Sequence, residues 1–177
     1  GRDHLISVEK AVLDLRHDEH IDAAIQSGIL DLAFIIGHQT NECIVPVKLA
    51  TRQDRIILLG DSNSFYGDDG ERRSRDQIIE AEFLGARLAH ATEICAAINA
   101  SELLSSPLIL DIDLDCFNTR QAISPHNPSV FYNLIQQAHA ITIARESACV
   151  ETCKLDDDLT ASWLEERLLD HIAQALS

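Results

Sequence analysis

The sequence predicts an α/β fold in which a mainly parallel sheet is flanked by helices. Short apolar runs of strand length alternate along the chain with stretches whose apolar residues recur at helical spacing. The length of 177 residues suits a single domain over 1–177 with a sizeable core. In such sheets ligands bind beyond the carboxyl ends of the strands, so residues just after each strand are the first candidates for a site.

The first half of the chain contains three apolar runs of strand length, which are Ala11–Leu15, Leu32–Ile36 and Arg55–Leu59. Between the first two, Ile21–Gln26 has the composition of a short helix. Gly28 is expected to end that helix, because glycine readily adopts the left-handed conformation that closes a helix.

The second half begins after an irregular stretch, Ser62–Asp76, whose glycines and charges predict a loop. The predicted elements then follow in this order: a helix over Gln77–Asn99, a strand over Leu108–Leu114, a helix over Val130–His139, a strand over Ala140–Ala144 and a helix over Thr160–Leu176. The threonine that opens the last helix is a plausible cap, since its hydroxyl can accept a bond from a backbone N–H group of the first turn.

The amino-acid composition limits the classes of partner that the protein is expected to bind. The net charge of −15 argues against nucleic acid or an anionic membrane, which both require a basic surface. No apolar run approaches the roughly 20 residues of a membrane span. The five cysteines are odd in number and form no C-x-x-C pair, which favours reduced thiols in a cytoplasmic protein. Apolar residues on the predicted C-terminal helix suggest a homo-oligomer.

Two acidic clusters lie far apart in the sequence. In the first, Asp18, His20 and Asp22 occupy alternate positions, and in the second Asp111 and Asp113 do so. Alternate side chains of an extended segment point the same way, so each set is expected to converge on one point. Carboxylates gathered in one place repel each other unless cations lie between them. The pattern predicts a site for one or two divalent metal ions.

The side chains in the two clusters indicate which metal ions they would bind. Carboxylate and imidazole without thiolate suit Mn²⁺, Mg²⁺ or Fe²⁺, with Zn²⁺ as an alternative. Two ions about 3.5–4 Å apart can clamp both the attacking and the leaving group of a reaction. A water between them ionises near neutral pH, which serves the hydrolysis of an unreactive C–N bond.

Three motifs resemble those of one enzyme family. Asp18-Glu19-His20-Ile21-Asp22 is similar to the D-x-H-x-D motif of the arginase and agmatinase (ureohydrolase) superfamily. Leu110-Asp111-Ile112-Asp113 resembles its later D-x-D motif, and Gly1-Arg2-Asp3-His4 is similar to its upstream G-G-D-H. The order along the chain is also that of the family. The resemblance implies an arginase-like three-layer α/β/α fold in a compact member of the family.

The resemblance also implies a site of two Mn²⁺ ions with six protein ligands. His4 and Asp22 would bind one ion, His20 and Asp113 the other, and Asp18 and Asp111 would bridge them. A metal-bridged hydroxide would then attack a guanidino, amidino or related C–N substrate, so the resemblance implies a small-molecule substrate as the partner.

Two further residues receive catalytic roles from the resemblance. Glu146, just after the predicted strand Ala140–Ala144, would bind the cationic group of the substrate, and His38 would shuttle protons. The family's D-x-D motif usually continues to an Asp-Pro pair and a loop rich in glycine and proline. Here Asp115-Cys116-Phe117 follows, and then Ser124-Pro125-His126-Asn127-Pro128, so the resemblance does not identify the substrate.

The sequence also admits different interpretations. Leu108–Asp115 resembles the first motif of haloacid dehalogenases too, in which Asp111 would be a phosphoryl-accepting nucleophile beside Mg²⁺. The chain could also be a non-catalytic arginase-like metal-binding protein. The first acidic cluster could be the acidic first turn of a helix with a solvated histidine. Glu146 could instead pair with Arg145 or Arg120.

Overall fold

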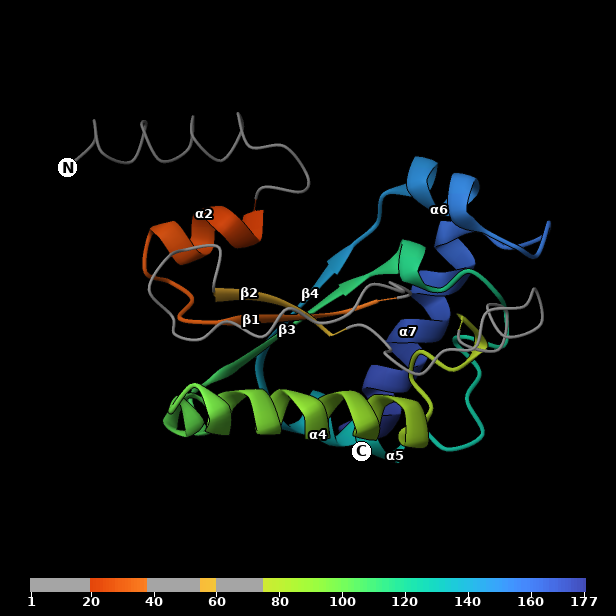
Figure 1. The fold of residues 1–177 in the computed structure, drawn as a ribbon. Coiled ribbons are helices and arrows are strands. Elements are labelled where there is room, and N and C mark those ends of the chain that lie inside the picture. The colour runs from red at the N-terminus through yellow and green to blue at the C-terminus, as the bar shows by residue number, and fades with distance from the viewer. Residues whose placement is uncertain (1–19, 38–54, 60–74) are drawn as a thin grey trace, which may run out of the picture.

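The computed structural model describes residues 20–37, 55–59 and 75–177 (Figure 1). The strands of this part form two parallel two-stranded sheets. Strand β1 (Ala33–Ile36) pairs with β2 (Ile56–Leu59), and β3 (Leu108–Asp113) pairs with β4 (Ala138–Ala144). The predicted α/β class with parallel pairing is therefore confirmed. The described residues form short pairs of strands, however, and not one large arginase-like sheet.

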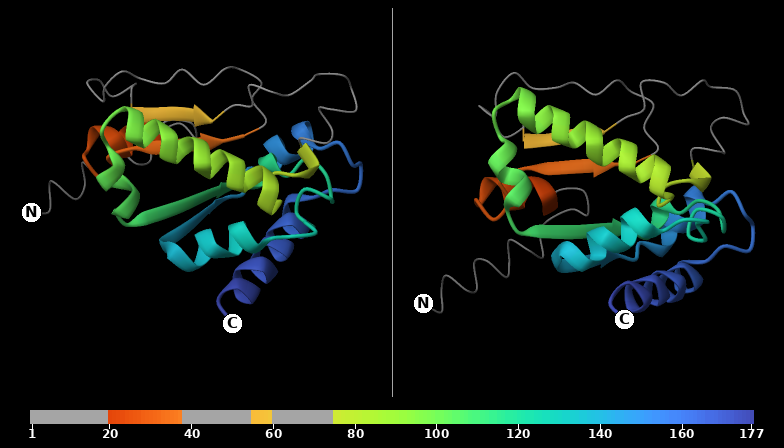
Figure 2. Two further views of the ribbon diagram at one scale, coloured as in Figure 1. Left: turned by 60° about the horizontal axis from the view of Figure 1, so that its bottom comes forward. Right: turned by 90° about the horizontal axis from the view of Figure 1, so that it is seen from below.

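Helices lie on both sides of these strands. They are α2 (His20–Gln26), α4 (Ala81–Ala97), α5 (Ser129–Gln137), α6 (Ser147–Cys153) and α7 (Ala161–Ala175), with short 3-10 turns η2 (Ser101–Ser105) and η3 (Leu114–Cys116). In Figure 1, α4 and α5 lie below the strands and α2 lies above them, and the views in Figure 2 agree with this arrangement. Within the described residues, no helix combines the length and apolarity needed to cross a membrane.

The predicted elements match the observed ones closely where they can be compared. Each of the four predicted helices in the described part corresponds to a helix, and Gly28 closes α2 with a φ of 73° as expected. The Thr160 hydroxyl accepts a hydrogen bond from the N–H of Trp163, 3.3 Å away, so the predicted cap of α7 is confirmed. The predicted strand Ala11–Leu15 lies outside the described residues, as does Ser62–Asp76 up to residue 74.

The differences from the prediction include the start of one strand and the presence of one helix. Strand β4 begins at Ala138 and not at Ala140, because the pairing with β3 shifts register near His139 and takes in two more residues. Helix α6 was not predicted at all. Its seven residues contain too few apolar positions to show a helical period.

The main core lies between the β3–β4 pair and the helices α5 and α7. Its most deeply buried side chains include Leu114, Phe117, Leu159, Leu164 and Leu168, each at most 1% exposed. A second, smaller cluster joins β2 to α4 through Ile57, Leu59, Ala91 and Ile94. The core thus covers one face of β3 and β4.

The other face of β3 carries the acidic motif. Exposure alternates along the strand: Ile112 is buried, whereas Asp111 and Asp113 are exposed. Apolar and polar residues alternate in the same way in the sequence, which is the pattern of a strand with one face on a core. Because α5 and α7 occupy the core side, the two carboxylates lie on the side of the sheet opposite the core.

Candidate functional site

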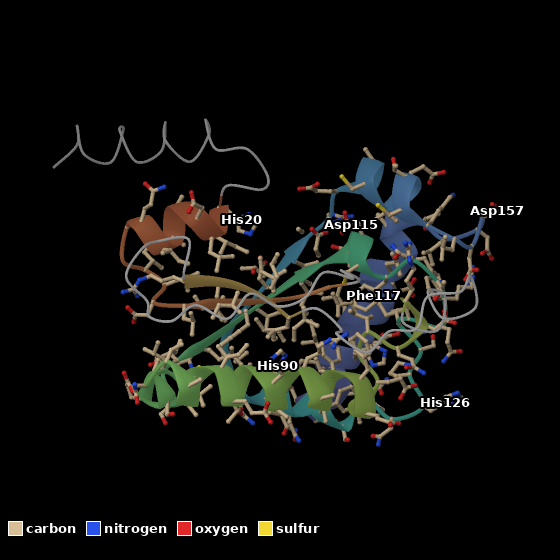
Figure 3. All side chains as sticks on the ribbon, in the orientation of Figure 1. His20, His90, Asp115, Phe117, His126 and Asp157 are labelled. Atoms are coloured by element: carbon tan, nitrogen blue, oxygen red, sulfur yellow. The ribbon has the colours of Figure 1, made fainter. Side chains whose placement is uncertain are left out.

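The two motifs that are remote in sequence meet at one pair of side chains. Nε2 of His20 lies 2.9 Å from Oδ2 of Asp111, although 91 positions separate these residues along the chain. His20 is the first residue of α2, from which its ring projects (Figure 3). The side chains are 53% and 38% exposed, so both are accessible to solvent and to ions.

The second oxygen of Asp111 also has a partner. Oδ1 of this carboxylate accepts a hydrogen bond from the Thr142 hydroxyl of β4. Thr142 is directly opposite Asp111 in the parallel register of the two strands. The sequence does not identify Thr142 as a site residue, because only the strand register brings it to the site, and one sequence does not fix that register.

Asp113 lies two residues beyond Asp111 on the same face, as predicted. Its Oδ1 accepts a hydrogen bond from the backbone N–H of Asp115 at 3.3 Å, and this bond caps η3. The carboxylate is exposed at the end of β3. It therefore stands at the carboxyl edge of the sheet, where ligands of parallel sheets bind.

Asp22 departs from the expected geometry. The extended conformation predicted for this cluster is wrong over the described residues, because His20 and Asp22 both belong to α2. Helical positions two apart do not face each other. The carboxylate of Asp22 instead accepts a hydrogen bond from Gln26 at 3.3 Å, one turn later. The interpretation of these residues as a first helical turn is correct, but it leaves the His20–Asp111 contact unexplained.

Three of the predicted site residues, His4, Asp18 and His38, lie outside the described residues. Among residues 20–37, 55–59 and 75–177, no group of three or more histidine, cysteine or acidic side chains is arranged to hold a metal ion. Of the six predicted metal ligands, His20 and Asp111 are the two that the described structure places in contact. The number of ions remains a prediction.

Glu146 lies two residues after the end of β4, close to the place that the sequence predicts, and immediately precedes α6. Its Oε2 accepts a hydrogen bond from the Cys149 thiol, with 3.1 Å between the oxygen and Sγ. The alternative pairing with an arginine is wrong. Arg145 pairs with Glu165 at 2.8 Å, and Arg120 pairs with Asp158 at 2.7 Å. Cys149 was also missed, although its spacing of three residues from Glu146 was a usable signal.

The Cys149–Glu146 contact changes the chemistry of the thiol. The hydrogen bond to Glu146 raises the pKa of Cys149 to about 11, and burial acts in the same direction. A negative carboxylate stabilises the protonated thiol, which can donate to it, and repels the thiolate. Cys149 is therefore a poor nucleophile near neutral pH.

Replacing Glu146 with glutamine should activate this thiol. Without the carboxylate, the pKa of Cys149 should fall toward the usual ~8.5 of a cysteine, and alkylation by iodoacetamide at about pH 8 should be roughly tenfold or more faster. Peptide mapping by mass spectrometry would follow Cys149 alone. Glu151→Gln removes the same charge from α6, where Glu151 pairs with Lys154, and should leave the rate unchanged. Equal rates in wild type and Glu146→Gln would contradict the role given to the carboxylate.

The segment after β3 is held by bonds to distant parts of the chain. The Thr119 hydroxyl contacts the carboxylate of Asp76, and the Glu80 carboxylate accepts the backbone N–H groups of His126 and Asn127 at 2.6 and 3.1 Å. Arg120 also lies over the Trp163 ring, 4.4 Å from its centre. This chain thus has a firmly anchored segment where the ureohydrolase resemblance would place a substrate loop.

A hollow of about 380 Å³ opens beside this segment. It is lined by Asp76, Gln77, Glu80, Glu82, Gln121 and His126. Figure 3 shows His126 and His20 far apart in the molecule, so this hollow is not part of the candidate site.

No protein-family model, curated protein or solved structure matches this chain. The ureohydrolase resemblance therefore rests on the sequence motifs. The geometry adds one independent fact, the meeting of the first motif with the second through His20 and Asp111.

Proposed function

We propose that this protein is a metal-dependent hydrolase of ureohydrolase type that acts on a guanidino, amidino or related C–N substrate. Divalent cations, Mn²⁺ first among them, would be held at the carboxyl end of β3. The observation that supports the proposal is the contact between His20 and Asp111 across 91 positions of sequence.

The contacting atoms suit a metal ion. Neighbouring ligand atoms around a six-coordinate ion with bonds of about 2.1 Å are roughly 3 Å apart. The His20 nitrogen and the Asp111 oxygen are 2.9 Å apart, an ordinary hydrogen-bond distance that is also close to this spacing, so both could bind one ion once the imidazole turns its Nε2 lone pair toward it. Imidazole and carboxylate are also the donors that Mn²⁺ accepts. The hydrogen bond from Thr142 does not prevent this, since an ionised carboxylate has about four lone-pair positions.

The remaining proposed ligands are His4, Asp18 and Asp113, together with Asp22, whose carboxylate would first have to leave Gln26. When bound, divalent ions would acidify water and neutralise charge that develops on the scissile group. Glu146 stands two residues beyond Ala144, the register partner of Asp113, at the end of the neighbouring strand. A carboxylate in that place can accept hydrogen bonds from a cationic guanidino or amidino group and orient it toward β3. His38 is the proposed proton shuttle.

A simple ion pair or a nucleophilic Asp111 would give different experimental results. If His20 and Asp111 form only an exposed ion pair, the pair contributes about 0–1 kcal/mol to stability and has no bearing on metal affinity. If Asp111 is a nucleophile of the haloacid-dehalogenase type, beryllium fluoride with Mg²⁺ would form a stable aspartyl-phosphate mimic on it.

The test begins with the full chain stripped of metal by a chelator. Isothermal titration with Mn²⁺ should show saturable binding, and the loaded protein should release urea or ammonia from some member of a guanidino and amidino panel. Excess chelator should abolish turnover, and Mn²⁺ should restore it. Absence of binding at millimolar Mn²⁺ would refute the proposal. Binding without turnover would support a non-catalytic metal-binding protein instead.

A further inference from the structure

We propose that Thr142 is a positioning residue, which fixes the carboxylate of Asp111 in the orientation that metal binding requires. The inference rests on the proposed function and extends it to a residue outside the ureohydrolase-like motifs. Its basis is that the two oxygens of Asp111 have separate partners, the Thr142 hydroxyl at Oδ1 and the His20 ring at Oδ2.

The strand register creates this contact. In the parallel β3–β4 pair, Asp111 is opposite Thr142, with Ile109 opposite Ala140 and Asp113 opposite Ala144. Side chains at paired positions of neighbouring strands lie on the same face of the sheet. On this face of β4, the methyl groups of Ala140 and Ala144 thus flank the Thr142 hydroxyl. This hydroxyl is the hydrogen-bond donor that these three positions present to β3.

The direction of the hydrogen bond is fixed by chemistry. An ionised carboxylate only accepts, so the Thr142 hydroxyl must donate its proton to Asp111. Threonine is also stiff about its first side-chain torsion, and a strand holds its backbone, so the donor has a fixed position. A second contact at Oδ2 then defines the plane of the carboxylate. An exposed aspartate without this donor would exchange among rotamers and hydrate on both oxygens.

A pre-oriented ligand binds its ion more tightly, because less conformational freedom is lost on binding. Partners that hydrogen-bond to metal ligands typically change metal affinity by about 10–100-fold. Thr142 should therefore affect the affinity for Mn²⁺ without contacting the ion. A role limited to packing would affect stability instead.

The experiment compares Mn²⁺ affinity among variants by isothermal titration and by the Mn²⁺ electron paramagnetic resonance signal. Thr142→Val retains the branched shape but removes the hydroxyl, and should weaken binding about 10–100-fold. Thr142→Ser retains the hydroxyl and should bind within about threefold of wild type. Thr92→Val is the matched control, since the Thr92 hydroxyl donates to the carbonyl of Leu88 on α4, and it should bind like wild type. Thermal unfolding without metal should be nearly the same for all four proteins.

The possible outcomes separate this inference from the function on which it rests. If wild type binds Mn²⁺ and Thr142→Val binds equally well, Thr142 has no positioning role but the proposed function stands. Equal losses in Thr142→Val and Thr142→Ser would also overturn the role of the hydroxyl. If wild type binds no Mn²⁺, both proposals fall together. Should Thr142→Val fail to fold, Thr142→Ala, which removes the hydroxyl without adding a methyl group, carries the same expectation.

Discussion

Replacement of His20 with alanine, or of Asp111 with asparagine, is expected to weaken Mn²⁺ binding by on the order of 100-fold or more. The magnitude follows because loss of a direct ligand should cost at least as much as the 10–100-fold loss seen for residues that only support a ligand. Isothermal titration of the chelator-treated variants would measure it. His139→Ala and Asp31→Asn remove exposed groups of the same kinds elsewhere and should bind like wild type.

The stability of the metal-free variants shows whether His20 and Asp111 form a metal site or only an ion pair. Both side chains are partly exposed, so breaking their contact should change the free energy of unfolding of the metal-free protein by less than about 1 kcal/mol. The double variant should lose little more affinity than either single variant, because residues that act on one ion are not independent. Unchanged Mn²⁺ affinity in both single variants would show that the contact is only an ion pair.

The largest expected effect on stability is that of Leu164→Ala, at about 3–5 kcal/mol less free energy of unfolding. Leu164 is 0% exposed and belongs to the main core that α7 shares with β3 and β4. Removing its isobutyl group takes apolar surface out of the core and leaves a cavity that the surrounding elements can only partly close. Equilibrium unfolding in urea, followed by circular dichroism, would measure the change.

Leu169→Ala is the matched control on the same helix. Leu169 is 51% exposed, so its truncation should cost roughly 0.5 kcal/mol or less. Because α7 packs on the side of β3 away from Asp111, the metal-binding variants and the core variants should affect different properties. Similar losses for the two leucines would mean that α7 does not pack through the face that includes Leu164.

The strand that carries the second motif could be predicted in detail. Apolar and polar residues alternate over Leu110–Asp113, and the structure shows the same alternation in exposure. Amphipathic spacing located α7 equally well, together with its threonine cap. In these elements the local pattern and the packing agree, so the sequence alone was sufficient.

The first motif was harder because its pattern supports two local structures. Alternate polar residues suggest an extended segment, yet Ile21–Gln26 also has the composition of a helix. The helix forms and extends back to His20, and it buries Ile25 while His20 faces Asp111. Tertiary packing decided between the two, and it is not visible in a short stretch of sequence.

The contact between β4 and Asp111 was beyond prediction for a related reason. The pairing of Thr142 with Asp111 depends on the register of β3 and β4, which includes a shift near His139. A different register would place Ala140 or Ala144 beside the carboxylate. The Glu146–Cys149 contact, in contrast, is local and could have been inferred had the short helix α6 been recognised.

Anomalous diffraction at the manganese absorption edge, from crystals grown with Mn²⁺, is the most direct test of a cation between the two motifs. A site of the proposed kind predicts an anomalous peak within bonding distance of both His20 Nε2 and Asp111 Oδ2. It also predicts that substitution of either residue removes the peak. A crystal saturated with Mn²⁺ that shows no peak near these atoms, with the imidazole and carboxylate still in direct contact, would contradict the proposed metal site.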